Sequence, residues 1–393
     1  METSDLLEQL DGHLCSPNIS WLLGAGISRN ANIPLMYPLT DRVLFLLKEQ
    51  KSKYIDLINT VISEIDDRCH VEHLLSHFGD YAALADRAKT KEITIGGSAV
   101  TCADIDSVHG EIVNAIADTI RWGYAAAEKD GAKPELIGTQ GQSITDVRPH
   151  REFVAACFKS ARAGLNERRG AVKFFTTNYD TLLEDALSLS RTKYWDGFEG
   201  GAVAYKAYRL GDGDPPPGYA AHVIKLHGSI DWHLNDDDGR VYKVRYGDTY
   251  PAAKQRVLIY PQATKYIAAQ RDPFSAQFEL FRRALMTGVD STIAVCGYSF
   301  GDDHINQELE MALARPDSKT TLVAFCFEAD GKIPSCLDEW RTSSWGSRVY
   351  VASNKGLYVG NGPPKVVPSE GELHWWTFDG VTKILMNGSA GAL

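Results

Sequence analysis

Short apolar runs recur along the chain, and most end in polar turn residues followed by helix-type periodicity. The first run, Ile19 to Leu23, stops at Gly24-Ala25-Gly26, which predicts a buried strand that enters a tight turn and then a helix. Strands alternating with helices predict an α/β fold with a Rossmann-like, doubly wound parallel sheet. The further strands are expected at Val172 to Thr176, Val223 to Leu226, Val257 to Tyr260, Thr292 to Cys296, Leu322 to Phe327 and Arg348 to Val351.

Helix-type periodicity replaces the β-type runs between about residues 41 and 165, which predicts a helical insertion. We expect this insertion to interrupt one catalytic domain that spans residues 1–352. The Gly- and Pro-rich stretch Gly197 to Ala221 is typical of a long surface loop. Residues 353–393 form a predicted C-terminal appendage, a hairpin or a subunit contact.

Composition narrows the class of protein. The 393 residues are 44% hydrophobic and 23% charged, which is typical of a soluble globular chain. A formal net charge of -10 argues against broad electrostatic binding to nucleic acid. The N-terminal residues 1–20 contain no apolar leader and no later run is long enough to cross a membrane, so we expect a cytoplasmic protein. None of the seven cysteines forms a C-x-x-C pair of the kind that holds structural zinc.

Two predicted strands end in residues that suit a nucleotide. Gly24 and Gly26 lack side chains, so backbone N–H groups could face a pyrophosphate there, although a tight turn in any α/β protein would look similar. The strand Val172 to Thr176 runs straight into Thr177-Asn178-Tyr179-Asp180. Because ligands bind at the carboxyl ends of strands in open α/β sheets, Asn178 is either a ligand contact or a helix N-cap.

Two later strands deliver polar side chains to the same edge of the predicted sheet. His227 follows the run Val223 to Leu226, and histidine suits general-base or hydroxyl-orienting work because it changes charge near neutral pH. A lone histidine at a strand end is also often structural. Gly297-Tyr298-Ser299 follows the strand Thr292 to Cys296, and Ser299 is the candidate for ligand contact there.

These four pieces together resemble the sirtuin superfamily, and they occur in the family's order over residues 19 to about 328. The pieces are Gly-Ala-Gly-Ile-Ser at 24–28, Thr-x-Asn-x-Asp at 176–180, His-Gly at 227–228 and Gly-x-Ser at 297–299. The resemblance implies NAD+ binding, with catalytic roles for Asn178, Asp180 and His227. It also implies dinucleotide contacts from Gly24, Ala25, Gly26, Ser28, Thr177, Gly297, Ser299 and, more loosely, Glu328.

The chain differs from those sirtuins that deacylate proteins, and the differences point to one branch of the superfamily. A deacylase sirtuin carries two zinc-holding cysteine pairs after the histidine, whereas residues 229–260 contain no cysteine. The long helical insertion, with Val71-Glu72-His73-Leu74-Leu75 inside it, is similar to the bacterial sirtuin-like NADases of anti-phage defence. This resemblance implies a regulated, NAD-depleting effector that cleaves its substrate NAD+ to nicotinamide and ADP-ribose without a metal.

Loss of nicotinamide leaves an oxocarbenium-like ribose, so such an enzyme must favour charge at the anomeric carbon and admit a water. We expect Asn178 to position the water or a ribose hydroxyl, His227 to act as base or orienting group, and Asp180 to help hold the carboxamide. Two other interpretations stay open. One is a zinc-independent, NAD-dependent protein deacylase, and the other is a non-catalytic module that binds NAD or an ADP-ribose derivative to control assembly.

One segment offers a competing metal site. Cys69, His70, Glu72, His73 and His77 crowd a helix-like stretch, and His73 with His77 forms an i, i+4 pair that could bind zinc. A polar helix face or a contact with a neighbouring subunit explains the same residues. We expect no bound metal.

The resemblance also implies partners, because similar effectors are paired with a HerA-type ATPase, an Argonaute or a phage-protein sensor. No residue chooses among these three. We expect a homo-oligomer as well, held by the insertion and the tail. Tyr358, Trp375, Trp376 and Phe378 lie beyond the last expected strand, where they would leave an apolar patch in water unless the tail folds back onto its own domain.

Overall fold

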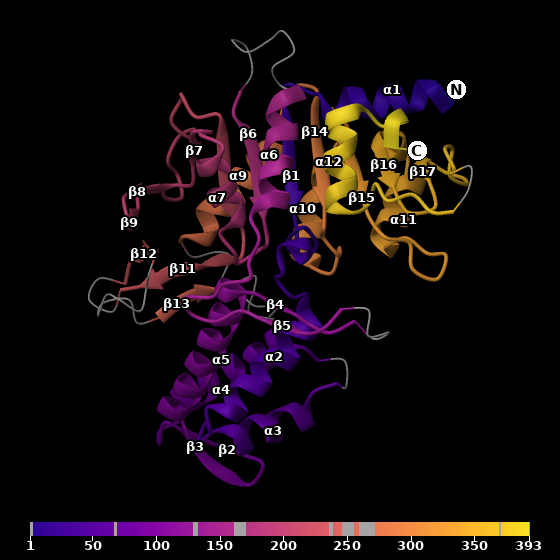
Figure 1. Cartoon of the computed structure of the whole chain (residues 1–393). Coiled ribbons are helices and arrows are strands. Elements are labelled where there is room, and N and C mark those ends of the chain that lie inside the picture. The colour runs from indigo at the N-terminus through magenta and orange to yellow at the C-terminus, as the bar shows by residue number, and fades with distance from the viewer. Residues whose placement is uncertain are drawn as a thin grey trace.

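The fold is built around one large, mostly parallel sheet, which confirms the predicted Rossmann-like α/β class (Figure 1). The computed structural model describes residues 3–66, 69–128, 133–160, 170–235, 239–245, 255–258, 272–368 and 371–392. Only β17 runs antiparallel to its neighbour in the large sheet. The strands, in their order across it, are β17 (Leu357–Val359), β16 (Val349–Ala352), β15 (Thr320–Phe325), β14 (Ser291–Cys296), β1 (Ile19–Leu23), β6 (Val172–Thr176), β10 (Ala221–Lys225) and β7 (Tyr194–Trp195).

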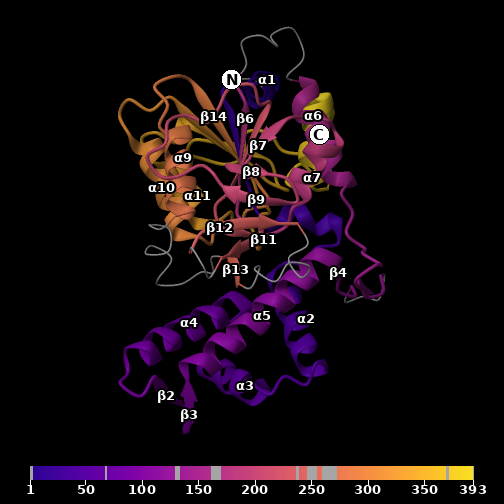
Figure 2. The ribbon, with the colours of Figure 1, turned by 90° about the vertical axis from the view of Figure 1, so that its left-hand side faces the viewer.

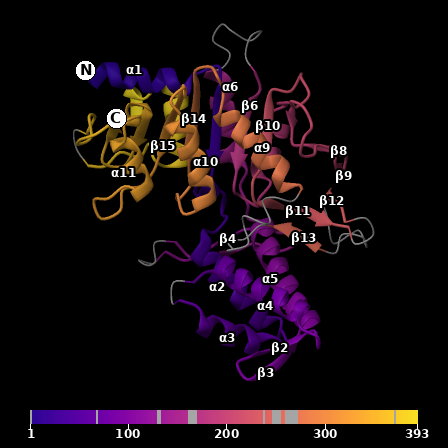
Figure 3. The same cartoon turned by 180° about the vertical axis from the view of Figure 1, so that it is seen from behind.

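Helices cover both faces of the large sheet, which explains why its strands read as continuous apolar runs. In β1, Trp21 and Leu23 pack into the core on one face, and Leu22 packs into the core on the other. The first face carries α1 (Thr3–Leu14), α6 (Arg148–Ser160), α7 (Leu182–Leu189) and α12 (Phe378–Asn387). The second face, seen in Figure 3, carries α9 (Phe274–Leu285), α10 (Asp303–Ala314) and α11 (Ser335–Thr342). Among the described residues, no helix has the length and apolar character needed to cross a membrane.

The strand order reverses direction at the centre of the sheet. β1 lies between β6 and β14, and the chain passes through β6 and β10 on one side before it returns to β14 and β15 on the other. Such a reversal leaves a crevice at the carboxyl ends of the central strands, where ligands of this fold class bind. The crevice here therefore lies beyond the ends of β1 and β14.

A second, antiparallel sheet corrects two predictions (Figure 2). The strand expected at Val257 to Tyr260 lies in this sheet, and residues 259–260 fall outside the described part of the chain. Part of the loop expected at Gly197 to Ala221 is a hairpin, because neighbouring strands supply its backbone partners. The strands, in order, are β13 (Gln255–Leu258), β11 (Gly228–Leu234), β12 (Val241–Val244), β9 (Val203–Lys206) and β8 (Phe198–Gly200).

A helical module, residues 36–122, lies at the carboxyl edge of the large sheet with its own core (Figure 1). It contains α2 (Met36–Glu49), α3 (Ile55–Glu64), α4 (Val71–Arg87), the hairpin β2 (Glu92–Ile95) with β3 (Ser98–Thr101), and α5 (Cys102–Trp122). A short pair, β4 (Tyr124–Ala125) and β5 (Leu136–Ile137), follows it. The expected insertion reached to about residue 165, but α6 within that range packs on the large sheet beside α12 and not on the module.

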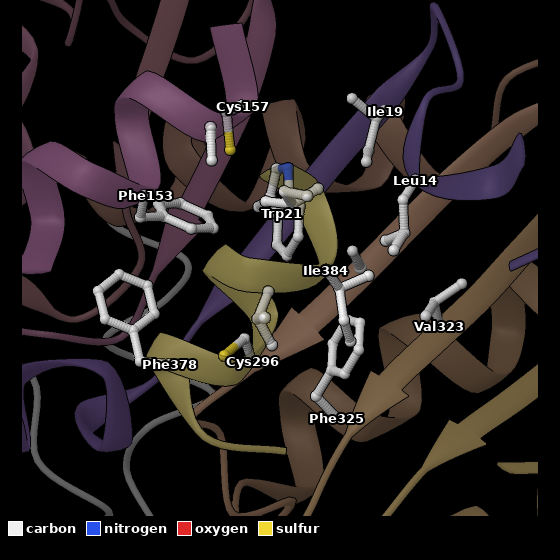
Figure 4. Packing of buried hydrophobic residues seen from close by; sticks show 14 of the residues in the cluster. Leu14, Ile19, Trp21, Phe153, Cys157, Cys296, Val323, Phe325, Phe378 and Ile384 are labelled. Carbon is white, nitrogen blue, oxygen red and sulfur yellow. The ribbon is translucent and has the colours of Figure 1, made fainter. Parts of the chain in front are cut away.

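The C-terminal segment folds back onto the large sheet, so two of the four aromatic side chains expected in an apolar patch are buried. Trp375 is 1% exposed and Phe378 is 4% exposed, both within the core under α6. The Phe378 ring lies 4.9 Å from that of Phe153, which in turn packs on Trp21 (Figure 4). Their burial removes part of the reason for expecting a homo-oligomer, which stays a prediction.

Replacing Trp375 by alanine is expected to lower the free energy of unfolding by about 3–5 kcal/mol, the usual effect of removing a large buried aromatic ring. The substitution also removes the indole N–H that donates to the Ser353 carbonyl. Urea unfolding followed by circular dichroism measures the change. Val367→Ala, at a side chain that is 60% exposed, is the control and should stay within about 0.5 kcal/mol of the wild type.

Candidate functional site

Most of the predicted site residues line one large cavity. It measures about 710 Å³ and lies at the carboxyl ends of β1, β6, β10 and β14, with the helical module on its far side. Gly24 and Glu328 are the two predicted residues outside its lining. The predicted residues that line it are Ala25, Gly26, Ser28, Thr177, Asn178, Asp180, His227, Gly297 and Ser299.

Ser28, Asn178 and Asp180 form one buried hydrogen-bond chain. The Ser28 hydroxyl donates to Asp180 Oδ2 at 2.8 Å, so its oxygen can only accept from Asn178, whose Nδ2 lies 3.1 Å away. This fixes the orientation of the Asn178 amide. Its Oδ1 is buried and accepts no hydrogen bond from the described residues, although Asn178 lines the cavity. Such an oxygen suits a donor supplied by a ligand or a water.

The loop that carries Asn178 and Asp180 is held at both ends. The Thr177 N–H donates to the Leu23 carbonyl at 3.1 Å, which ties the loop to β1. The Asn178 N–H donates to Thr176 Oγ1 at 3.0 Å, and Asp180 Oδ1 accepts from the Leu182 N–H at 3.0 Å, where α7 begins. Both carboxylate oxygens of Asp180 thus accept a hydrogen bond within the protein.

A buried lysine also supports this loop through hydrogen bonds to its backbone. Lys225, at the end of β10, donates its ammonium to the backbone carbonyls of Tyr179 and Asp180. Its Nζ also lies 3.3 Å from Glu184 Oε1. Burial raises the pKa of Glu184 to about 7, against the opposing effect of the Lys225 charge. This buried lysine at the end of an apolar strand is therefore a structural support for the candidate site.

His227 reaches the cavity because the chain changes sheets at this point. β10 ends at Lys225, and β11 begins at Gly228 with φ of +85°, a left-handed conformation that favours glycine. His227 lies in the turn between these strands, 4% exposed and in the cavity lining. Its ring stacks on that of His304 from α10, with centroids 5.6 Å apart and planes 26° apart.

The glycine turn after β1 packs against the turn after β14. A Cβ on Gly24 would come within 2.5 Å of the Gly297 carbonyl oxygen and Tyr298 Cα, so glycine is required there by backbone packing. The Gly26 N–H donates to the Gly297 carbonyl at 2.8 Å and is engaged within the protein. The helix expected after this turn is a 3₁₀ helix, Ala25–Ala31. Two strand-end loops are thereby locked together beside the cavity.

Glu328 faces away from the cavity. Its Oε2 accepts hydrogen bonds from the hydroxyls of Ser353 at 3.1 Å and Tyr358 at 2.8 Å. Its own N–H donates to Asn354 Oδ1 at 2.7 Å. These contacts join the end of β15 to the β16–β17 hairpin.

Several cavity residues were not predicted from the sequence. His70, Glu72 and His73, at the start of α4, line the cavity from the helical module. Phe327 and Trp376 line it from the other side, with ring centroids 4.8 Å apart. The Val71-Glu72-His73 signal was visible in the sequence, but nothing local connects it to residues around Asn178.

The histidines in and next to α4 contact one another and a glutamate. The rings of His70 and His73 lie 3.8 Å apart, and His77 Nε2 lies 3.6 Å from Glu64 Oε2. Across the described ranges, no three or more His, Cys, Asp or Glu side chains are grouped so that they could hold a metal ion.

Part of the candidate site lies in a segment that matches a known protein family. Residues 172–345 match a family model described as a SIR2-like domain, and this range includes Asn178, Asp180, His227 and Ser299. The glycine turn at residues 24–26 and the helical module lie before the match. No curated protein matches the chain. The matched domain, the doubly wound sheet and the strand-end cavity support a sirtuin-like family with an NAD-related function.

Proposed function

We propose that this protein is an NAD+ glycohydrolase that cleaves NAD+ to nicotinamide and ADP-ribose. The observation that carries the proposal is the Asn178 Oδ1 atom, which is buried at the cavity and has no hydrogen-bond donor among the described residues. Ser28 holds the amide so that this acceptor stays available. A water or a ribose hydroxyl is the donor that it suits.

The reaction needs only water as the second substrate. The C–N bond between ribose and the pyridinium nitrogen breaks, and its electron pair stays on that nitrogen, so nicotinamide leaves as a neutral molecule. The water oxygen then bonds to the anomeric carbon and loses one proton. We assign His227 to accept or orient that proton and Asn178 to position the oxygen. A site that fixes these groups before reaction favours charge at the anomeric carbon.

The remaining cavity walls suit the rest of the dinucleotide. Ser299 and the turn at residues 24–26 would lie beside the phosphates and riboses. The rings of Phe327 and Trp376 would stack on the adenine, because a flat base packs well on an aromatic face. We further propose that the enzyme acts in anti-phage defence by depleting NAD+, which rests on the sequence resemblance described above.

The direct test is incubation of the purified protein with NAD+, with and without an acetylated peptide. Nicotinamide and ADP-ribose in equal amounts, independent of peptide, are the expected products. An acetylated ADP-ribose that forms only with peptide would replace the proposal with a deacylase. Calorimetric binding of NAD+ without any nicotinamide release would replace it with a binding module.

A further inference from the structure

A buried hydrogen bond joins the helical module to the candidate catalytic loop. The Tyr179 hydroxyl donates to Glu72 Oε1 at 2.7 Å, and 107 residues separate the two in sequence. Tyr179 lies between Asn178 and Asp180, while Glu72 lies in the first turn of α4. Both Glu72 and Tyr179 also line the cavity.

Tyr179 is clamped at both of its ends. Its backbone carbonyl accepts hydrogen bonds from the Ser229 hydroxyl at 3.2 Å and the Ile230 N–H at 3.0 Å, which hold it to β11. Its side chain, only 7% exposed, enters the core of the helical module beside Leu182. The module thus holds the ring of the residue whose backbone joins Asn178 to Asp180.

Glu72 is well placed to hold that ring. Its side chain is 9% exposed, and a carboxylate removed from water is stable only when it is hydrogen-bonded. The N-terminus of α4 favours a negative charge in its first turn. The Val71 N–H donates to Thr40 Oγ1 at 2.8 Å, which ties this turn to α2. A phenol donating to a carboxylate is among the stronger neutral–ionic hydrogen bonds.

We propose that Glu72 is a positioning residue through which the helical module aligns Asn178 and Asp180 for catalysis. This inference rests on the proposed function. In this role Glu72 acts through Tyr179, and no chemical step is assigned to it. A loop that loses this anchor places the Asn178 amide less accurately, and misplacement of a catalytic group by about 1 Å can lower a rate 100-fold.

The test compares Tyr179→Phe, Glu72→Ala, Glu72→Gln and the double variant Tyr179→Phe/Glu72→Ala. Tyr179→Phe and Glu72→Ala should each lower kcat for NAD+ hydrolysis by about 10- to 100-fold, with KM changed less than about threefold. Glu72→Gln should retain most of the rate, because its amide oxygen still accepts from the phenol. The double variant should be no slower than either single variant, since both break the same bond.

A second tyrosine–glutamate pair provides the matched control. The Tyr81 hydroxyl of α4 donates to Glu64 Oε2 of α3 at 2.5 Å, within the module, and neither residue lines the cavity. Tyr81→Phe should leave kcat unchanged. Amide exchange of residues 176–182 provides a readout without turnover and should be faster in Tyr179→Phe than in Tyr81→Phe.

The outcomes separate this inference from the proposed function. A wild-type protein that releases no nicotinamide contradicts the glycohydrolase, while the exchange measurement still decides whether Glu72 positions the loop. Wild-type kcat in Tyr179→Phe overturns the inference, and so do additive losses in the double variant. Loss of activity in Glu72→Gln with normal Tyr179→Phe would overturn it as well, because the charge and not the hydrogen bond would then matter.

Discussion

Replacing Asn178 by alanine is expected to lower the rate of NAD+ hydrolysis by at least about 100-fold, the usual effect of removing a positioned catalytic group. The substitution removes Asn178 Oδ1, the buried acceptor at the cavity that has no donor among the described residues. Ser28 keeps its hydrogen bond to Asp180, so we expect the loop to stay folded. The loss of one buried hydrogen bond should lower the free energy of unfolding by only about 1 kcal/mol.

Asn30→Ala is the matched control for this prediction. Asn30 also lines the cavity, but it is exposed and its Nδ2 donates to Asp379 at 3.0 Å. Nicotinamide release should be close to wild type in Asn30→Ala and nearly absent in Asn178→Ala, at equal helicity by circular dichroism. A rate in Asn178→Ala within about threefold of wild type would remove Asn178 from the catalytic role.

The sheet and the strand-end cavity were predictable because both follow from local patterns. Val172 to Thr176 and Thr292 to Cys296 are apolar on both faces, as strands of a covered parallel sheet must be. In such a sheet the carboxyl ends lie along one edge. Asn178, His227 and Ser299 were therefore expected to meet before any distance was known, and they line one cavity.

The antiparallel sheet was not predictable for the opposite reason. β8 and β9 are three and four residues long and lie among glycines, so their sequence is typical of a loop. β9 pairs with β12, which lies 35 or more residues away along the chain, and that pairing makes β9 a central strand. The burial of Trp375 is similar, because the core that receives it includes residues of α6 and β1, which lie far away along the chain.

For two predicted site residues, the sequence resemblance implied a ligand contact, whereas the structure shows contacts within the protein. Gly24 is a glycine because the backbone of Gly297 lies against it, a contact between loops that are far apart in sequence. Glu328 follows an apolar strand, as a ribose contact would. Its carboxylate, however, accepts hydrogen bonds from Ser353 and Tyr358. Position at a strand end was sufficient to place a residue near the edge of the sheet, but not to aim its side chain.

Replacing His227 by alanine is expected to lower kcat by at least about 100-fold, since a positioned base contributes that much or more. His227→Gln separates the two roles assigned to this side chain, because glutamine can orient a hydroxyl but cannot take up a proton. If His227 is the base, His227→Gln should be as slow as His227→Ala, and the decline of kcat/KM at acidic pH should disappear. If it orients the ribose or the water, His227→Gln should keep a substantial part of the rate.

His222→Gln is the control for this experiment, because His222 lies near the start of β10, the strand that leads to His227, and packs on Trp195 with ring centroids 5.4 Å apart. Burial, assisted by the nearby Lys173 charge, lowers the pKa of His222 to about 4. His222 therefore stays neutral at any pH above about 5, and an acidic limb in the wild-type profile cannot come from it. Equal, wild-type profiles in His222→Gln and His227→Ala would exclude His227 from the reaction and leave its contact with His304 as its function in the structure.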